Sequence, residues 1–146
     1  MPNISTYSFL DIAMNFNHPS VGQYSLQGEG MGSISVAMAG DRTAHDVAAD
    51  GSVMVSKIAG NNGTISISVQ QTSPLHKFLL GWWNYIKDPN TPSSEYALAT
   101  IMIRAVSMGE ETFATGVSPQ KLPDKPYQQQ GQQVTWALMA ADIDQN

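Results

Sequence analysis

Residues 64–83, TISISVQQTSPLHKFLLGWW, change from a strand pattern to a helix pattern at their midpoint. In the first seven residues, isoleucine and valine alternate with hydroxyl and amide side chains, which is the period of two of a half-buried strand. Ser73 and Pro74 then match an N-cap and the first position of a helix. The sequence therefore predicts a strand that leads directly into an apolar helix.

The predicted helix covers about residues 74–87 and ends before Asp88 and Pro89. At 100° per residue its apolar arc spans about 160°. That arc contains Leu75, Phe78, Leu79, Trp82, Trp83, Tyr85 and Ile86. Two interpretations that do not exclude each other follow: a core helix that seals one end of the sheet, and a helix whose second flank contacts a neighbouring subunit.

Strand-like segments account for most of the remaining chain. Residues 6–16 and 21–27 read as one hairpin, and residues 95–106 and 111–117 as another pair. The remaining strand-like segments are 33–38, 52–58, 64–70 and 133–143, with a glycine turn at 60–63 between the second and the third. We expect a single domain over residues 1–146, mainly β: an antiparallel sandwich or partly closed barrel of about eight strands with one flanking helix.

Charged residues are scarce, at 13% of 146 residues against about 25% in ordinary soluble domains. Either much of the surface lies against other copies of the chain, or the domain simply carries little charge; composition does not decide between them. The net charge is −5 without a basic block, which argues against a protein that grips nucleic acid. It is compatible with a surface past which nucleic acid slides.

Two further features have no obvious chemistry. The connection GDRTAHDVAADG at residues 40–51 is long for a segment without helical pattern. Small neutral side chains also alternate with apolar ones along the strands and predict one polar face, made of Ser33, Ser35, Ser52, Ser56, Thr64, Ser66, Ser68 and Gln70. Such a face is ordinary toward solvent, but on the inner wall of a ring it would give a passing polymer little to hold.

Patterns that indicate catalysis or metal binding are weak. His45, Asp46 and Asp50 lack the alternating oxygen ligands of an EF-hand loop. Glu110 and Glu111 are adjacent, an arrangement that is more often solvated than catalytic, and there is no G-x-S-x-G motif. We expect no enzyme, metal or cofactor. The lack of a basic leader and of an apolar run of about 20 residues predicts a soluble protein made in the cytoplasm without a membrane segment.

Residues 32–79, GSISVAMAGDRTAHDVAADGSVMVSKIAGNNGTISISVQQTSPLHKFL, resemble the central block of tail tube proteins of contractile-tailed bacteriophages. The residues at 49–51 (Ala-Asp-Gly) and 72–75 (Thr-Ser-Pro-Leu) carry most of this resemblance. TYSFLDI near the start and KLPDKPYQQQGQQVTWALMAADID near the end are also similar to that family. Residues 42–46 and Trp82-Trp83 depart from its pattern.

The resemblance implies a virion tail protein, related in fold to secretion-system tube proteins and assembled as stacked hexameric rings. DNA would pass through the rings without sequence-specific binding, and the partners would be sheath, baseplate and tail-terminator proteins. The inter-ring loop would include Asp41, Arg42, His45, Asp46, Asp50 and Gly51, with Asp46 and Asp50 as polar anchors. The lumen face would carry Ser33, Ser35, Ser66 and Ser68, and the helix residues Leu75, Phe78, Leu79, Trp82, Trp83 and Ile86 would join core and inter-subunit contacts.

The alternative belongs to another class of protein: a monomeric β-sandwich that binds a carbohydrate or a protein. Its stacking surfaces would be Trp82, Trp83 and Trp136. Light scattering separates the two interpretations, because a binding module should stay near 15.8 kDa whereas a tube protein should form rings or filaments.

Overall fold

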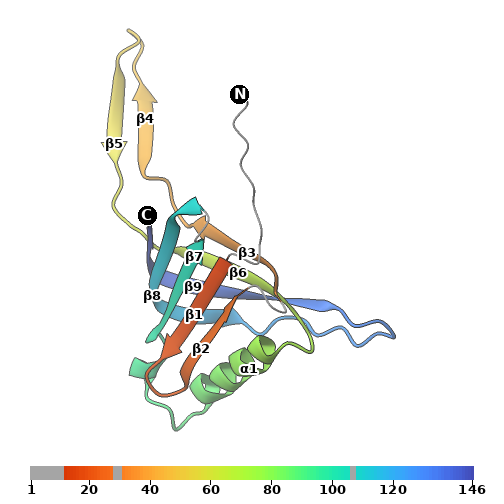
Figure 1. The fold of residues 1–146 in the computed structure, drawn as a ribbon. Coiled ribbons are helices and arrows are strands. Elements are labelled where there is room, and N and C mark those ends of the chain that lie inside the picture. Colours follow the sequence, from red (N-terminus) through yellow and green to blue (C-terminus); the bar gives the residue numbers. More distant parts are fainter. Residues whose placement is uncertain (1–11, 28–30, 106–107) are drawn as a thin grey trace.

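The fold is one curled antiparallel sheet that wraps around a single helix (Figure 1). The computed structural model describes residues 12–27, 31–105 and 108–146. The strands of the large sheet lie in the order β2-β1-β7-β8-β9-β6-β3. Their bounds are β1 Ile12–His18, β2 Gly22–Gln27, β3 Met31–Met38, β6 Gly63–Gln70, β7 Ala99–Ala105, β8 Glu110–Lys121 and β9 Gln133–Gln145.

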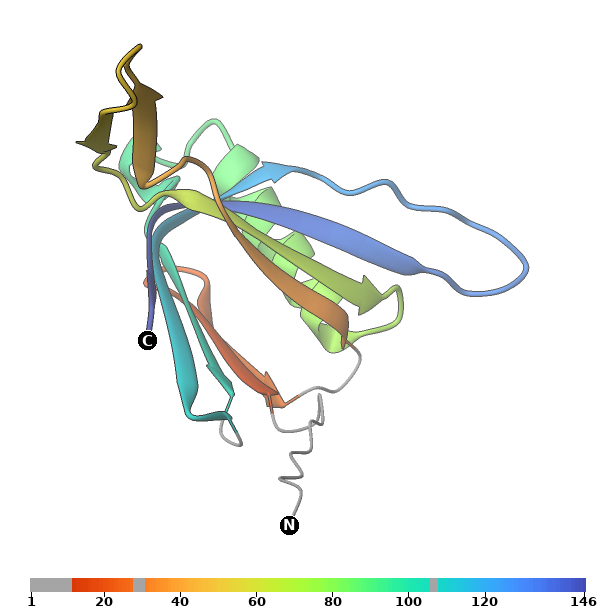
Figure 2. The same ribbon diagram turned by 90° about the horizontal axis from the view of Figure 1, so that it is seen from above.

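Two further strands, β4 (Thr43–Val47) and β5 (Val53–Lys57), form a separate two-stranded sheet. The large sheet curls so that its two halves face one another across the interior (Figure 2). The prediction of a mainly β chain with one flanking helix is confirmed, in the form of a partly closed barrel.

The helix α1 runs from Pro74 to Lys87, as the sequence predicts. Ser73 caps it: its Oγ accepts a hydrogen bond from the backbone N–H of Leu75 at 3.2 Å. Pro74 occupies the first turn, where its missing N–H leaves no helical hydrogen bond unmade. Lys87 lies in the last turn, where a positive charge favours the helix dipole. A 3₁₀ turn, η2 (Ser93–Glu95), follows before β7.

The core lies between α1 and the concave face of the sheet. Phe16 from β1 contacts two helix rings edge-on, with centroids 4.8 Å from Trp82 and 5.4 Å from Phe78. On the predicted helix face, Phe78, Trp83 and Tyr85 are half-buried, and the other residues are buried, namely Leu75, Leu79, Trp82 and Ile86. The helix is therefore a core element, and the exposed part of Trp83 stays available for a further contact.

Strand β6 pairs with β9 and with the edge strand β3. Ile67 lies opposite Trp136 of β9 and Ile34 of β3. The isoleucine and valine side chains of β6 are buried in the core with the helix, so the serines between them point to the opposite face. One strand therefore supplies both the core and the polar face.

His76 supplies a hydrogen-bond partner for one polar group of the core. The buried Trp136 indole donates its Nε1–H to His76 Nδ1 at 3.1 Å. Burial of the imidazole, and secondarily the charge of Lys125, lower the pKa of His76 below its ordinary value. The neutral ring is the form that accepts this hydrogen bond.

Several predicted strand limits are wrong. Residues 43–47 lie within the predicted loop 40–51 but form β4, which pairs with β5. Residues 95–98 precede β7 and are not strand, and β8 extends to Lys121, so Pro119 lies inside it beside a register shift. Residues 6–11 of the predicted first strand lie outside the described residues, while the β1–β2 and β7–β8 pairs are confirmed.

Candidate functional site

The β4–β5 hairpin projects from the body and is exposed along both strands (Figure 1). Its register places Val47 opposite Val53, and His45 opposite Val55. Val47, Val53 and Val55 are 65%, 50% and 60% exposed. An isolated two-stranded hairpin is marginally stable in water, and an apolar protrusion of this kind indicates a surface that is covered in an assembly.

The base of the hairpin is tied to the body by Arg42. Its guanidinium donates to the Asn61 side-chain oxygen and, at 3.5 Å, to the carbonyl of Ile58. The backbone N–H of Ile143 in β9 donates to the carbonyl of Asn61 at 2.7 Å. Arg42 and Asn61 therefore connect the hairpin to the end of β9. Gly60, directly before Asn61, has a φ of +135° and bends the chain where it leaves the hairpin.

Asp50 stabilises the tip of the hairpin. Its Oδ1 accepts from the Ser52 hydroxyl at 2.6 Å and from the Ser52 backbone N–H at 3.0 Å. These two bonds lower the pKa of Asp50. Gly51 has a φ of +88°, which completes the turn. Asp50, predicted as a polar anchor between rings, therefore forms its hydrogen bonds within its own turn. Asp46, the other predicted anchor, lies exposed on β4.

The second candidate surface is the uncharged face of β3, β6 and β9. Ser35 lies opposite Ser66, and Ser33 opposite Ser68. Across the next strand boundary, Ala137 is the partner of Ser66. Residues 31–38, 63–70 and 133–141 contain no charged side chain. Ser52 and Ser56, which the sequence pattern placed on this face, belong to the hairpin instead.

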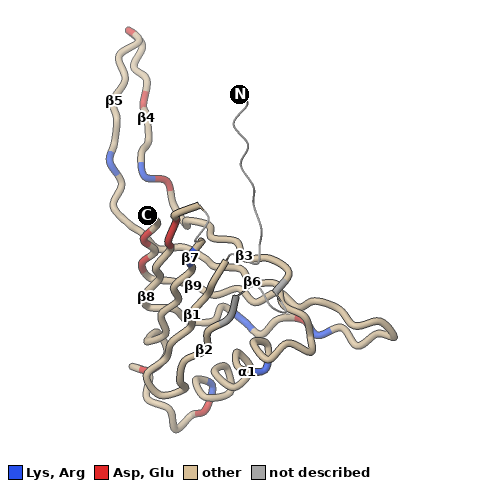
Figure 3. The backbone as a smooth tube through the Cα atoms, viewed as in Figure 1, with Lys and Arg blue, Asp and Glu red and all other residues tan. Residues whose placement is uncertain are grey.

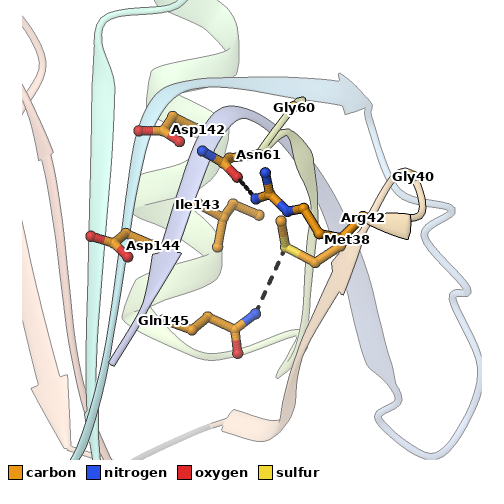
Figure 4. Close-up of a pocket in the computed structure, with 9 residues that line it drawn as sticks. All are labelled: Met38, Gly40, Arg42, Gly60, Asn61, Asp142, Ile143, Asp144 and Gln145. Carbon is orange, nitrogen blue, oxygen red and sulfur yellow. Dashed lines mark hydrogen bonds between the residues drawn. The ribbon is translucent and has the colours of Figure 1, made fainter. Parts of the chain in front are cut away.

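Charge is gathered at the ends of the strands (Figure 3). Glu111 pairs with Arg104 across β7 and β8, with Nη2 and Oε1 3.5 Å apart. Asp142 and Asp144 lie at the end of β9 beside the base of the hairpin (Figure 4). The sheet thus keeps its charges away from the serine face.

The tryptophans do not form a binding platform. Trp82 and Trp136 are fully buried and Trp83 is half-buried, so the alternative of a carbohydrate-stacking surface fails for the first two. In the part of the chain that the structure describes, no group of three His, Asp or Glu residues is placed to hold a metal ion. No helix among the described residues has the length and apolarity needed to cross a membrane.

Sequence reasoning missed the apolar side chains of the hairpin. It selected the charged residues at 41–50 and assigned Val53 and Val55 to a strand of the main sheet. The VMV run at residues 53–55 is the signal that was available: without a polar residue between them, three apolar side chains cannot all face one core.

The fold occurs in contractile injection systems. A chain in the structure of the anti-feeding prophage cap superposes with a TM-score of 0.61 at 10% identity, over 100% of this chain and 94% of that one. A chain in the sheath/tube terminator of the PVC extracellular contractile injection system gives 0.58 at 12% identity, over 100% and 98%. The PVC sheath–tube complex in its extended state gives 0.55 at 10% identity, over 91% and 87%.

The sequence itself matches the family described as "Bacteriophage PhiTE tail tube protein" over residues 4–146. The chain belongs to this family, and it is a structural component of a phage tail tube. A comparison with curated proteins gives no match.

Proposed function

We propose that this chain is the repeating subunit of the tail tube, in which six copies form a ring and stacked rings enclose the channel for genome delivery. Family membership and the shared fold support the tube role. The observation that carries the stacking is the β4–β5 hairpin, which places three exposed valines outside the body. Stacking would remove these side chains from water.

In this proposal the hairpin makes the inter-ring contact. Its apolar residues supply the buried area, and its polar and charged residues set its direction: Asp41, Arg42, His45, Asp46 and Asp50. The Arg42–Asn61 hydrogen bond holds the base of the hairpin, which reduces the entropy lost on docking.

The serine face then lines the channel. Phosphate binding requires lysine or arginine, and the two strands that carry Ser33, Ser35, Ser66 and Ser68 have neither. DNA would pass over hydroxyl groups that do not hold its phosphates.

The remaining surface serves the rest of the tail. The half-buried Trp83, at one edge of the apolar arc of α1, would contact a neighbouring subunit. Sheath, baseplate and tail-terminator proteins would be the other partners, and the subunit would be made in the host cytoplasm before assembly into the virion. A structural subunit of this kind needs no catalytic residue or cofactor.

Light scattering and negative-stain microscopy of the purified protein test the proposal. A hexamer of 15.8 kDa chains has a mass of 6 × 15.8, or about 95 kDa. Rings of that mass, or tubes built from them, are expected. A particle that remains at the mass of one chain at every protein concentration would contradict the proposal.

Replacing residues 42–58 by a short glycine-serine linker separates stacking from ring formation. We expect folded protomers or single rings, because the large sheet keeps all seven strands. Long tubes formed by this variant would show that the hairpin is not the inter-ring contact.

Cysteine labelling tests the lumen assignment, since the natural chain contains no cysteine. In assembled tubes, Ser35→Cys should react slowly with a maleimide too bulky to enter the channel. Asn84→Cys, on the exposed strip of α1, is the matched control and should react quickly. Equal rates for the two variants in tubes would place the serine face outside the lumen.

A further inference from the structure

The connection between β8 and β9 is a second protrusion, which extends from the body in a different direction from the hairpin (Figures 1 and 2). It covers residues 122–132. Tyr127 in this connection is 87% exposed, more than any other large hydrophobic residue that the structure describes. Tyrosine is among the residues that contribute most binding energy at interfaces, and this ring has no packing partner to explain its position.

The connection is held in shape from its base. Gln71 reaches both limbs: its Nε2 donates to the Pro126 carbonyl at 2.6 Å, and its Oε1 accepts from the backbone N–H of Gln132 at 3.1 Å. The backbone N–H of Gln71 donates to the Gln132 carbonyl at 3.2 Å. Pro123 is buried and Pro126 half-buried. A limb ordered in this way loses less entropy when it docks.

An open pocket of 520 Å³ lies at the other end of β9. Figure 4 shows its lining, which comes from β9 and from the base of the hairpin. Met38 and Ile143 supply apolar atoms, and Arg42 forms part of the wall with its guanidinium held by Asn61. Asp142 and Asp144 supply carboxylates.

These groups match the chemistry of a tyrosine. A guanidinium plane stacks on an aromatic ring, and the apolar side chains of the pocket contact the ring edge. Lys121 at the end of β8 and Lys125 in the connection outnumber Asp124 between them, so a net positive charge near Tyr127 meets the negative charge of Asp142 and Asp144 on the other partner.

The positions of Tyr127 and of the pocket define the partner. The connection precedes Gln133 and the pocket includes Asp142 to Gln145, so the two lie at opposite ends of one strand. A chain cannot fill its own pocket across the length of β9, whereas a second copy placed end to end along that direction can. Contacts of this head-to-tail kind close into rings when the rotation between copies permits.

We propose that Tyr127 of each copy inserts into the pocket at the end of β9 of the next copy in the same ring. The proposal rests on the proposed ring assembly and names the surface that closes it. The hairpin then stacks rings, and the β8–β9 connection joins neighbours within a ring.

Disulfide trapping tests this contact directly. We expect the Tyr127→Cys/Gln145→Cys double variant, oxidised after assembly, to give a covalent ladder of multimers on a non-reducing gel. Each copy carries one thiol at position 127 and one in the pocket, so disulfides can link successive copies. Gln145 is exposed and lines the pocket. The matched control is Tyr127→Cys/Ser94→Cys, whose second thiol is exposed near η2. It should stay monomeric on the same gel.

The outcomes separate the two proposals. If the natural protein forms no rings, the proposed function fails whatever the thiols do. If the variants form rings and the control pair cross-links as fast as the test pair, or the test pair does not cross-link, the ring assembly stands and the Tyr127 contact is wrong.

A second variant needs no new bond. Tyr127→Ala should raise the protein concentration needed for ring formation roughly tenfold or more, as truncation of a central interface aromatic does. Gln129→Ala, in the same exposed stretch, should leave it nearly unchanged. Ring formation by Tyr127→Ala at the same concentration as the natural protein would overturn the proposal. This holds even if the variant no longer bound a sheath protein.

Discussion

The body of this protein and its β4–β5 hairpin use apolar side chains in opposite ways. In the body, Phe16, Trp82 and Trp136 are fully buried between helix and sheet. In the hairpin, Val47 and Val55 lie mostly in water. The core of the body is buried within a single chain, whereas the hairpin has no core of its own and, in the proposed assembly, would be covered by another molecule. Changes in the body should therefore alter folding, and changes in the hairpin should alter assembly.

The largest expected effect is in the body. Phe16→Ala removes the ring that contacts both Phe78 and Trp82, so the free energy of unfolding should fall by about 3–5 kcal/mol. Urea unfolding followed by tryptophan fluorescence measures it. A fall below about 1 kcal/mol would mean that this side of the core is loosely packed.

Two glycines give a smaller, matched contrast. A Cβ at Gly63 would overlap the Ala37 carbonyl and lie 2.8 Å from Ile143 Cδ1, whereas a Cβ at Gly40 meets nothing within 4 Å. Gly63→Ala should lower the free energy of unfolding by about 1–3 kcal/mol. Gly40→Ala should change it by about 0.5 kcal/mol or less in the same urea titration. Equal changes in the free energy of unfolding for the two variants would contradict the expected difference between the body and the base of the hairpin.

Burial of His76 makes the stability of the body depend on pH, because it lowers the pKa of the imidazole. Because the folded pKa of His76 is lowered, the unfolded chain binds more protons below its ordinary pKa of about 6.5. The contribution of neutral His76 to the free energy of unfolding is therefore expected to be complete above that pH and to be lost as the pH drops toward the folded pKa.

His76→Gln is the control for this prediction, since its side-chain oxygen can still accept from the indole. Urea titrations between about pH 7.5 and pH 5 should show a steeper loss of stability in the natural protein than in the variant. Identical slopes would exclude His76 as the source.

The smallest effect on stability belongs to the hairpin. Val55→Ser should change the free energy of unfolding by about 0.5 kcal/mol or less, because the side chain is already 60% exposed. The same variant should form fewer and shorter tubes in negative-stain images. A large loss of stability with normal tubes would reverse the comparison between the two regions.

Local patterns predicted the elements that contact the core. The helix at Pro74–Lys87 was predictable because Ser73, Pro74 and the 3.6-residue period all agree. The alternation in β6 was equally clear, since one face of that strand is buried. In both cases the signal is the burial of one side.

The remaining parts lack that signal. Strand β4, TAHDV, is exposed on both sides, so nothing forces an apolar alternation, and its pairing with β5 follows from the turn at Asp50 and Gly51. The strand order depends on contacts between distant segments, such as Ile65 with Leu138. The pocket at the end of β9 combines residues from three separate stretches of chain, which no local pattern brings together.

Hydrogen–deuterium exchange of the hairpin amides in free protomers and in assembled tubes tests the central claim most directly. We predict that amides of β4 and β5 exchange rapidly in the protomer and become strongly protected in the tube, while those of β6 are protected in both. Hairpin amides that exchange equally fast in tube and protomer would contradict the account, because the hairpin would then be uncovered in the assembly.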